Sequence, residues 1–308
     1  MVFALVAASA GAQSASEHVS LPRASGAIVG TLLTPTTSVR VPLVVIIAGS
    51  GPTDRDGNGP GIRPGNLRLL AEALAQRGIA TLRYDKRGVA GSVTAATTEF
   101  ELRFDMYADD AAAWVNKYRG DARFGPIVVL GHSEGSLLGM LAVQRAPADA
   151  LVSVAGVARR ADKVVHEQLA AQVPPALLAQ ADSIMASLVA GKTLDNTPAV
   201  LQSLFRPSVQ PYLISWFKYS GSQEIARLKV PVLVVQGTTD FQVSKSEADS
   251  LAMALPAAKV LVFDGMNHVM RLAPVDRMQQ MPSYLTDTIP LAPGLADSIA
   301  VFVKKVRR

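Results

Sequence analysis

The sequence contains no cysteine. A chain without thiols has no cysteine nucleophile, no disulfide and no cysteine-ligated zinc, so these kinds of site are excluded. Beyond the N-terminus it also lacks any apolar run near the ~20 residues that a membrane-spanning helix needs, so no transmembrane segment is predicted. Charged residues make up only 18% of the chain and hydrophobic residues 49%, which is the balance of a folded globular protein.

Basic residues form no cluster with interleaved aromatic residues. The net charge is +5, but the final "KKVRR" supplies four of the cations, and the rest of the chain is close to neutral. A nucleic-acid-binding surface requires a stripe of Lys and Arg along one face. We therefore expect no nucleic-acid partner and interpret the C-terminal cations as a solvated end. Nothing in the composition specifies an oligomeric state.

The N-terminus lacks positive charge, since no Lys or Arg precedes Arg23. Its stretch "MVFALVAASAGAQ" nevertheless has an apolar run followed by Ala10-Gly11-Ala12, the A-x-A pattern of a signal-peptidase site. We interpret residues 1–24 as a truncated, signal-like and flexible segment. This predicts a secreted or periplasmic protein, and the alternative is a cytoplasmic protein with an Ala/Ser-rich N-terminus.

From about residue 41, runs of Val, Ile and Leu alternate with helical patterns. This alternation is typical of an α/β fold, in which crossover helices join the strands of a mostly parallel sheet. Residues 26–35 suggest an antiparallel hairpin before it. Strands are predicted over 41–49, 79–85, 126–132, 150–156, 230–237 and 259–265. Helices are predicted over 67–78, 106–120, 134–144, 244–255 and 294–306.

Residues 157–228 interrupt this pattern. The segment lacks strand alternation and carries helical patterns such as "LLAQADSIMASLVAG". Plain connections between strands are short, and long ones are usually lids or binding elements. We predict a helical cap at 157–228, inserted into a core domain made of residues 25–156 and 229–308.

A candidate nucleophile lies in the stretch "VLGHSEGSL" at residues 129–137. Ser133 follows a buried strand, precedes a helical pattern and has Gly131 and Gly135 on either side. A nucleophile elbow needs this arrangement, because its strained turn exposes the hydroxyl and only glycine lets the neighbouring backbone pass so closely. The alternative is a serine that caps an ordinary strand-to-helix turn. The flanking strand and helix favour the nucleophile.

A serine hydroxyl needs a base, and histidine is the usual one. Of the four histidines, His268 follows the last predicted core strand on a loop, where the base belongs in the chain order Ser, Asp, His. His18 lies near the N-terminus, His166 lies in the cap, and His132 is expected to point away from Ser133.

Two acids are candidates for orienting His268. Asp240 lies just past the end of the strand before the last one, whereas Asp264 is only four residues before the histidine. The carboxylate must reach the imidazole nitrogen that faces away from the serine, and an acid on the neighbouring strand end approaches from that side. We therefore predict Asp240 as the third member of the triad.

Two backbone N–H groups must stabilise the oxyanion that forms during attack. One is predicted at Glu134, which follows Ser133 at a helix N-terminus whose dipole adds to the effect. The other is predicted in the loop "AGSGPTDRDGNG", at Ser50 with Gly51 as its neighbour. The Glu134 carboxylate would oppose an oxyanion, so we expect it to turn away and pair with a basic residue such as Arg87.

The stretch "DRDGNG" resembles the start of a calcium loop. Asp54, Asp56 and Asn58 have the right spacing, but the twelfth position is glycine where such a loop requires a bidentate Glu. No metal is predicted. The two aspartates are instead expected to brace the loop, against Arg55 or Arg87.

Five motifs, "GSGPTDRDGN", "YDKRG", "GHSEGS", "GTTD" and "GMNH", stand in an order and spacing that resembles the α/β-hydrolase superfamily. They are most similar to its serine esterases with a "HGSGPxDRDE" loop. The resemblance covers residues 25–306 and implies an α/β-hydrolase fold and an acyl hydrolase without a cofactor. Carried over by position, Ser133 is the nucleophile, Asp240 the acid and His268 the base. The chain departs from the family at Ala48, where the loop usually has a histidine, and in the glycine spacing after "YDKRG".

The predicted function is a carboxylic-ester hydrolase that acts on a small-molecule ester through an acyl-enzyme. Tyr212, Trp216, Phe217 and Tyr219 suggest an apolar acyl or aryl pocket, although such a cluster is also typical of cap packing. An acyl-CoA thioesterase or a serine peptidase is the alternative, because fold and triad specify acyl transfer but not the leaving group. The alternative of another class is a non-catalytic binding protein that retains the fold. Chain-length preference is not specified.

Overall fold

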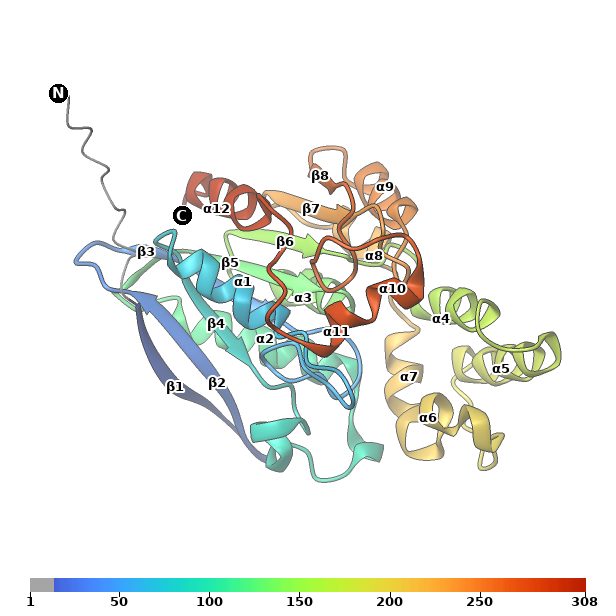
Figure 1. Ribbon diagram of the computed structural model, residues 1–308. Helices are drawn as coiled ribbons and strands as arrows, with labels where there is room; N and C mark the ends of the chain where they lie inside the picture. Colours follow the sequence, from blue (N-terminus) through green and yellow to red (C-terminus); the bar gives the residue numbers. More distant parts are fainter. Residues whose placement is uncertain (1–13) are drawn as a thin grey trace.

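The computed structural model describes residues 14–308 and contains an eight-stranded sheet in the order β1-β2-β4-β3-β5-β6-β7-β8 (Figure 1). β1 pairs antiparallel with β2 and β2 with β4, whereas all other neighbours are parallel. This mostly parallel sheet confirms the predicted α/β fold. The strands are β1 (Ser14–Arg23), β2 (Gly26–Pro35), β3 (Val41–Ile47), β4 (Ala80–Tyr84), β5 (Phe124–His132), β6 (Ala150–Val154), β7 (Val232–Gly237) and β8 (Lys259–Phe263).

The N-terminal hairpin begins earlier than the sequence suggests. Residues 14–23 form β1 and pair with β2 along their whole length. The prediction of a flexible segment up to residue 24 is therefore wrong for these residues. Val19 and Leu21 are buried while their neighbours are exposed, so only one face of this polar strand is covered. The signal-like pattern of residues 1–13 lies outside the described residues.

Helices cover both faces of the sheet (Figure 1). Apolar side chains of α1 and α12 form one core layer with the sheet, and those of α2, α3 and α9 form the other. The five helices are α1 (Asn66–Ala75), α2 (Phe104–Tyr118), α3 (Glu134–Arg145), α9 (Lys245–Ala254) and α12 (Leu295–Lys305). No helix in residues 14–308 is both long and apolar enough to cross a membrane.

β3 shows why its sequence is an unbroken apolar run. Leu43, Val45 and Ile47 pack in the layer of α2 and α3, whereas Val44 and Ile46 pack in the layer of α1 and α12. Successive side chains of a strand point to opposite faces, so a strand covered on both sides is apolar at every position. The central parallel strands therefore form a rigid support for the loops at their ends.

Between β6 and β7 the chain leaves the sheet and forms a group of helices at one side of the molecule (Figure 1). They have a small apolar core of their own, which includes Ile184, Leu188 and Phe205. We call α4 to α8 the inserted helices; they lie within the segment predicted as a cap. They are α4 (Ala161–Ala170), α5 (Pro175–Val189), α6 (Gln202–Phe205), α7 (Gln210–Trp216) and α8 (Gly221–Ala226).

After β8 the chain forms a loop and two single-turn helices, α10 (Arg277–Gln280) and α11 (Pro282–Leu285), before α12. The loops that follow β3, β5 and β7 leave the sheet from the same edge as this one, because the strands are parallel. The fold therefore brings four candidate site residues that follow these strand ends to the same edge of the sheet, at the carboxyl ends of its strands. They are Ser50, Ser133, Asp240 and His268.

Candidate active site

Ser133 occupies the turn between β5 and α3, with φ of 56° and ψ of −121°. This conformation is strained for a residue other than glycine. The turn is tight, since a Cβ on Gly131 would lie 2.0 Å from the carbonyl oxygen of Gly135, and a Cβ on Gly135 would lie 2.4 Å from that of Ile47. Within the described part of the chain, the Ser133 side chain makes no capping hydrogen bond to α3. The alternative of a simple helix cap therefore lacks its defining contact.

The carboxylate of Asp240 lies against the imidazole of His268, with 2.8 Å between Oδ2 and Nδ1. Oδ1 accepts the backbone N–H groups of Gln242 at 2.8 Å and Val243 at 2.9 Å, and the Gln236 amide donates to Oδ2 at 3.3 Å. Burial by itself disfavours the charged carboxylate. His268 and the two N–H groups outweigh this cost and hold the pKa of Asp240 below its usual value. Asp240 is therefore ionised and fixed in orientation.

Asp264, the other candidate acid, has a different partner. Its Oδ1 accepts a hydrogen bond from Thr238 Oγ1 at 2.9 Å, on an exposed part of the surface. The structure thus brings His268 together with the acid from the neighbouring strand end rather than with the one nearer in sequence.

His132 also contacts His268, which the sequence analysis missed. Its Nε2 lies 2.8 Å from the backbone oxygen of His268, and the two ring centroids are 4.8 Å apart. Burial and the nearby His268 lower the pKa of His132 to about 4, so the ring is neutral at physiological pH. A neutral ring can donate Nε2–H to the carbonyl, and it thereby supports the loop that carries His268.

The loop after β3 lies directly against the serine turn. A Cβ on Gly49 would lie 3.3 Å from the Cβ of Ser133. Gly51 has a φ of 69°, a left-handed conformation that glycine adopts without strain. Ser50 and Glu134, the two predicted oxyanion donors, border the same cavity as Ser133.

The acidic residues of "DRDGNG" hold the loop by contacts other than those predicted. Asp54 Oδ1 accepts the backbone N–H of Asp56 at 2.8 Å, and Asp56 pairs with Arg83 of β4. Arg55 pairs with Asp85 at 3.3 Å. Across residues 14–308, no group of three or more His, Cys, Asp or Glu side chains is placed to hold a metal ion.

Glu134 has a basic partner, but it is Lys86 rather than Arg87. Lys86 Nζ lies 3.2 Å from Glu134 Oε1 and also donates to the carbonyl oxygen of Gly49. The predicted pairing with Arg87 is wrong, because Arg87 Nη2 lies 2.7 Å from Asp110 of α2. The adjacent cations of "YDKRG", Lys86 and Arg87, thus contact different parts of the structure. The sequence pattern does not show which of the two meets Glu134.

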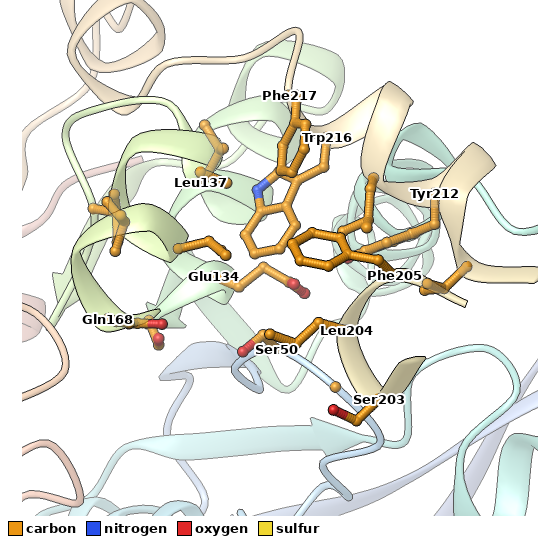
Figure 2. Close-up of a pocket in the computed structure, with 18 of the residues that line it drawn as sticks. Ser50, Glu134, Leu137, Gln168, Ser203, Leu204, Phe205, Tyr212, Trp216 and Phe217 are labelled. Carbon is orange, nitrogen blue, oxygen red and sulfur yellow. The ribbon is translucent and has the colours of Figure 1, made fainter. Parts of the chain in front are cut away.

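A cavity of about 490 Å³ opens beside Ser133, between the sheet core and the inserted helices (Figure 2). Tyr212, Trp216 and Phe217 all border it, as the sequence suggests. Tyr219 does not, because its hydroxyl donates to Asp105 at 2.6 Å. Further apolar lining comes from Leu137, Val164, Leu204, Phe205, Leu213 and Val243.

Several residues of this lining were missed by the sequence analysis. Phe205 of α6 and Gln168 of α4 border the cavity, although no motif marks them (Figure 2). Their helices carry apolar periodicity, but periodicity does not say whether the apolar face meets a core or an empty space. The orientation of the inserted helices decides that.

The sheet order, the strained serine at the end of a central strand and the histidine loop after the last strand define an α/β-hydrolase. The family described as serine aminopeptidase, S33, matches residues 63–272, and the chain belongs to this family. The fold prediction and the resemblance to α/β-hydrolases are thus confirmed.

The chain is similar to a curated relative, esterase EstD of Thermotoga maritima, with 27% identity over 270 residues. The match covers 82% of this chain and 61% of EstD, so the chain spans about three fifths of the length of that relative. Two solved structures share the fold. Est1E from Butyrivibrio proteoclasticus, bound to ferulic acid, has a TM-score of 0.60, 17% identity and coverage of 93% of this chain and 96% of that one. The esterase domain of a Rhodothermus marinus protein has a TM-score of 0.59, 15% identity and coverage of 96% and 99%.

Proposed function

We propose that the protein is a carboxylesterase whose nucleophile is Ser133. The observation that carries the proposal is the buried contact between His268 and Asp240 next to the strained serine turn, where His132, the residue before Ser133, contacts the backbone oxygen of His268. An ionised acid that orients a histidine beside a serine hydroxyl is the arrangement that activates serine for attack on a carbonyl.

The reaction would proceed in two halves. Ser133 Oγ attacks the ester carbonyl carbon while His268 takes the hydroxyl proton, and the N–H groups of Ser50 and Glu134 stabilise the resulting oxyanion. The bond to the alcohol then breaks, and His268 returns the proton to the leaving oxygen. Water attacks the acyl-enzyme in the same way and releases the acid. Asp240 keeps the imidazole in the required tautomer and stabilises the imidazolium.

An ester substrate is supported by the relatives and by the cavity. EstD and the Rhodothermus marinus domain are named as esterases, and Est1E was solved with ferulic acid bound. The cavity is of the size that small-molecule ligands occupy, and its walls are mostly aliphatic and aromatic. We infer an uncharged, apolar acyl or aryl group as the part of the substrate that it holds.

An aminopeptidase activity is the second candidate, because the matching family is described as serine aminopeptidase. Such an enzyme must bind the free ammonium group of its substrate, which requires an acid with unneutralised charge. Glu134 is the acidic side chain that borders the cavity, and Lys86 already pairs with it. Arg159 and Arg206 also border the cavity, and they are paired in turn with Glu247 and Glu99. The described lining thus offers no unneutralised acid for an ammonium group, which favours the ester over the amino-terminal substrate.

The test compares a panel of p-nitrophenyl esters from two to sixteen carbons, a feruloyl ester, an acyl-CoA and an amino-acid anilide. We expect the highest kcat/KM for an ester, and expect a fluorophosphonate probe to label Ser133. Labelling without turnover of any ester, but with turnover of the anilide or the thioester, would replace the ester proposal. Absence of labelling in the folded protein would exclude Ser133 as the nucleophile and favour a binding protein.

A further inference from the structure

Lys86 is a buried lysine next to the candidate active site, with only 3% of its surface exposed. It lies in the loop between β4 and η1 (Ala90–Ala95), and its ammonium contacts the Gly49 carbonyl and the Glu134 carboxylate. The ring of Tyr107 lies 5.6 Å from Nζ. Lysine is seldom fully buried unless it is paired, because desolvation of its charge is costly. The contacts of Lys86 therefore point to a role beyond packing.

The ammonium joins two segments that lie far apart in the sequence. Gly49 directly precedes Ser50, and Glu134 directly follows Ser133, so Lys86 contacts both segments that carry the proposed oxyanion donors. The two contacts span 37 and 48 residues of sequence. Oxyanion donors are effective only when they are held in place before the charge develops. A shared ammonium between the two segments supplies that constraint.

The Glu134 carboxylate brings negative charge close to where the reaction creates more. Its side chain is 1% exposed, so water screens it poorly. The titratable groups that face it are Lys86, Tyr107 of α2 and Tyr212 of α7. Burial and then the Glu134 charge raise the pKa of both tyrosines above the ordinary value, so both stay neutral. The balancing positive charge comes from Lys86.

We propose that Lys86 is a positioning residue with two tasks, which are to fix the separation of the Gly49 and Glu134 segments and to neutralise the Glu134 carboxylate. The proposal rests on the proposed function, since it takes Ser133 as the nucleophile. In a Lys86→Met variant, Glu134 would become an unpaired buried carboxylate. Its uncompensated charge would then oppose the developing oxyanion.

The experiment is a double-mutant cycle of wild type, Lys86→Met, Glu134→Gln and the double variant, with kcat and KM measured for one short ester. At pH 8 we expect Lys86→Met to lower kcat by about 10- to 100-fold with a smaller change in KM. The double variant should recover part of the loss at pH 8, because glutamine carries no charge.

Lys117→Met is the matched control. Lys117 also donates to a backbone carbonyl, that of Ser20, and lies 5.3 Å from the ring centroid of Trp114, but it borders β1 rather than the cavity. This variant should change kcat by less than about threefold. A double variant that is no more active than Lys86→Met would overturn the proposal and leave Lys86 a structural residue.

Two further measurements keep the test decisive. If circular dichroism shows that Lys86→Met does not fold, Lys86→Gln replaces it, since the amide removes the charge but keeps a donor for Gly49. If wild type hydrolyses no ester, the same cycle is run on the rate of fluorophosphonate labelling at Ser133. Failure of the ester panel then counts against the proposed function alone, whereas a flat cycle in the labelling rate counts against the role of Lys86.

Discussion

The sheet core and the inserted helices contribute to the candidate site in different ways. Around Ser133 the core places polar groups through specific contacts, such as those of His268 with Asp240 and with His132. The inserted helices contribute mainly apolar side chains, among them Trp216 and Phe217, which reach the cavity through packing. If the proposed function holds, we expect the core to set the chemistry, where small displacements are costly, and the inserted helices to select the substrates that fit the cavity.

The inserted helices are nevertheless anchored to the core by polar contacts. Arg206 Nε and Ser208 Oγ both donate to Glu99, which lies in the single-turn helix η2 (Glu99–Glu101) of the core. At the other end, Glu247 of α9 accepts the backbone N–H of Ala158 at 2.7 Å. These contacts hold the inserted helices against the core.

The largest expected effect is that of Ser133→Ala. The variant should fold normally and lose roughly 10⁴-fold or more in kcat for the best ester of the panel, as removal of a triad serine does elsewhere. Purified protein is assayed after circular dichroism confirms the fold. Activity above about a tenth of wild type would remove Ser133 from the mechanism.

The next effect distinguishes the two candidate acids of the core. Asp240→Asn should lower kcat roughly 10³- to 10⁴-fold, because asparagine cannot hold the required histidine tautomer. Asp264→Asn is the matched control, and it should cost less than about tenfold since its partner is Thr238. Both are assayed with one short ester at pH 8. If Asp264→Asn is the more damaged variant, the acid has been assigned to the wrong strand end.

Because of His132, we expect the free energy of unfolding of the core to depend on pH. Its pKa is lowered from 6.5 to about 4 in the folded protein, so the unfolded chain binds more protons between these values. Stability should therefore rise with pH through this window and be lost as the pH falls from about 6.5 to 4, by an amount of about 3 kcal/mol. Urea unfolding at pH 7 and pH 4.5 measures this loss.

Two variants check the assignment to His132. Glutamine does not titrate, so the free energy of unfolding of His132→Gln should change less between pH 7 and pH 4.5 than that of wild type. His166→Gln is the control from the inserted helices, because His166 pairs with Asp182 at an exposed site. If His132→Gln loses as much stability between pH 7 and pH 4.5 as wild type does, other groups cause that loss.

The smallest expected effect concerns the inserted helices. Trp216→Ala or Phe217→Ala should change the ratio of kcat/KM between short and long esters by about tenfold, because each pocket methylene is worth about 1–3 kcal/mol. Tyr219→Phe is the control, since Tyr219 is directed toward Asp105, and its ratio should stay within about twofold of wild type. If both pocket variants keep the wild-type ratio, the aromatic cluster serves packing alone.

How much of the fold and of the candidate site the sequence predicts depends on how far apart along the chain the interacting residues lie. The alternation of apolar strands and helices identifies the α/β fold, since both patterns are local and follow from the geometry of the backbone. Gly131 and Gly135 identify the turn at Ser133 for the same reason. Chain order and the geometry of parallel strands together select Asp240 over Asp264 as the residue that meets His268.

Other features were decided by the tertiary structure alone. Lys86 rather than Arg87 meets Glu134, because the Lys86 side chain is directed to Gly49 and Glu134 whereas that of Arg87 is directed to Asp110 of α2. Tyr219 is directed away from the cavity by its contact with Asp105. Residues 14–23 become a strand because β2 offers them a free edge to pair with. Each of these outcomes depends on a partner far away in the sequence, and a local pattern carries no information about which distant partner will be near once the chain has folded.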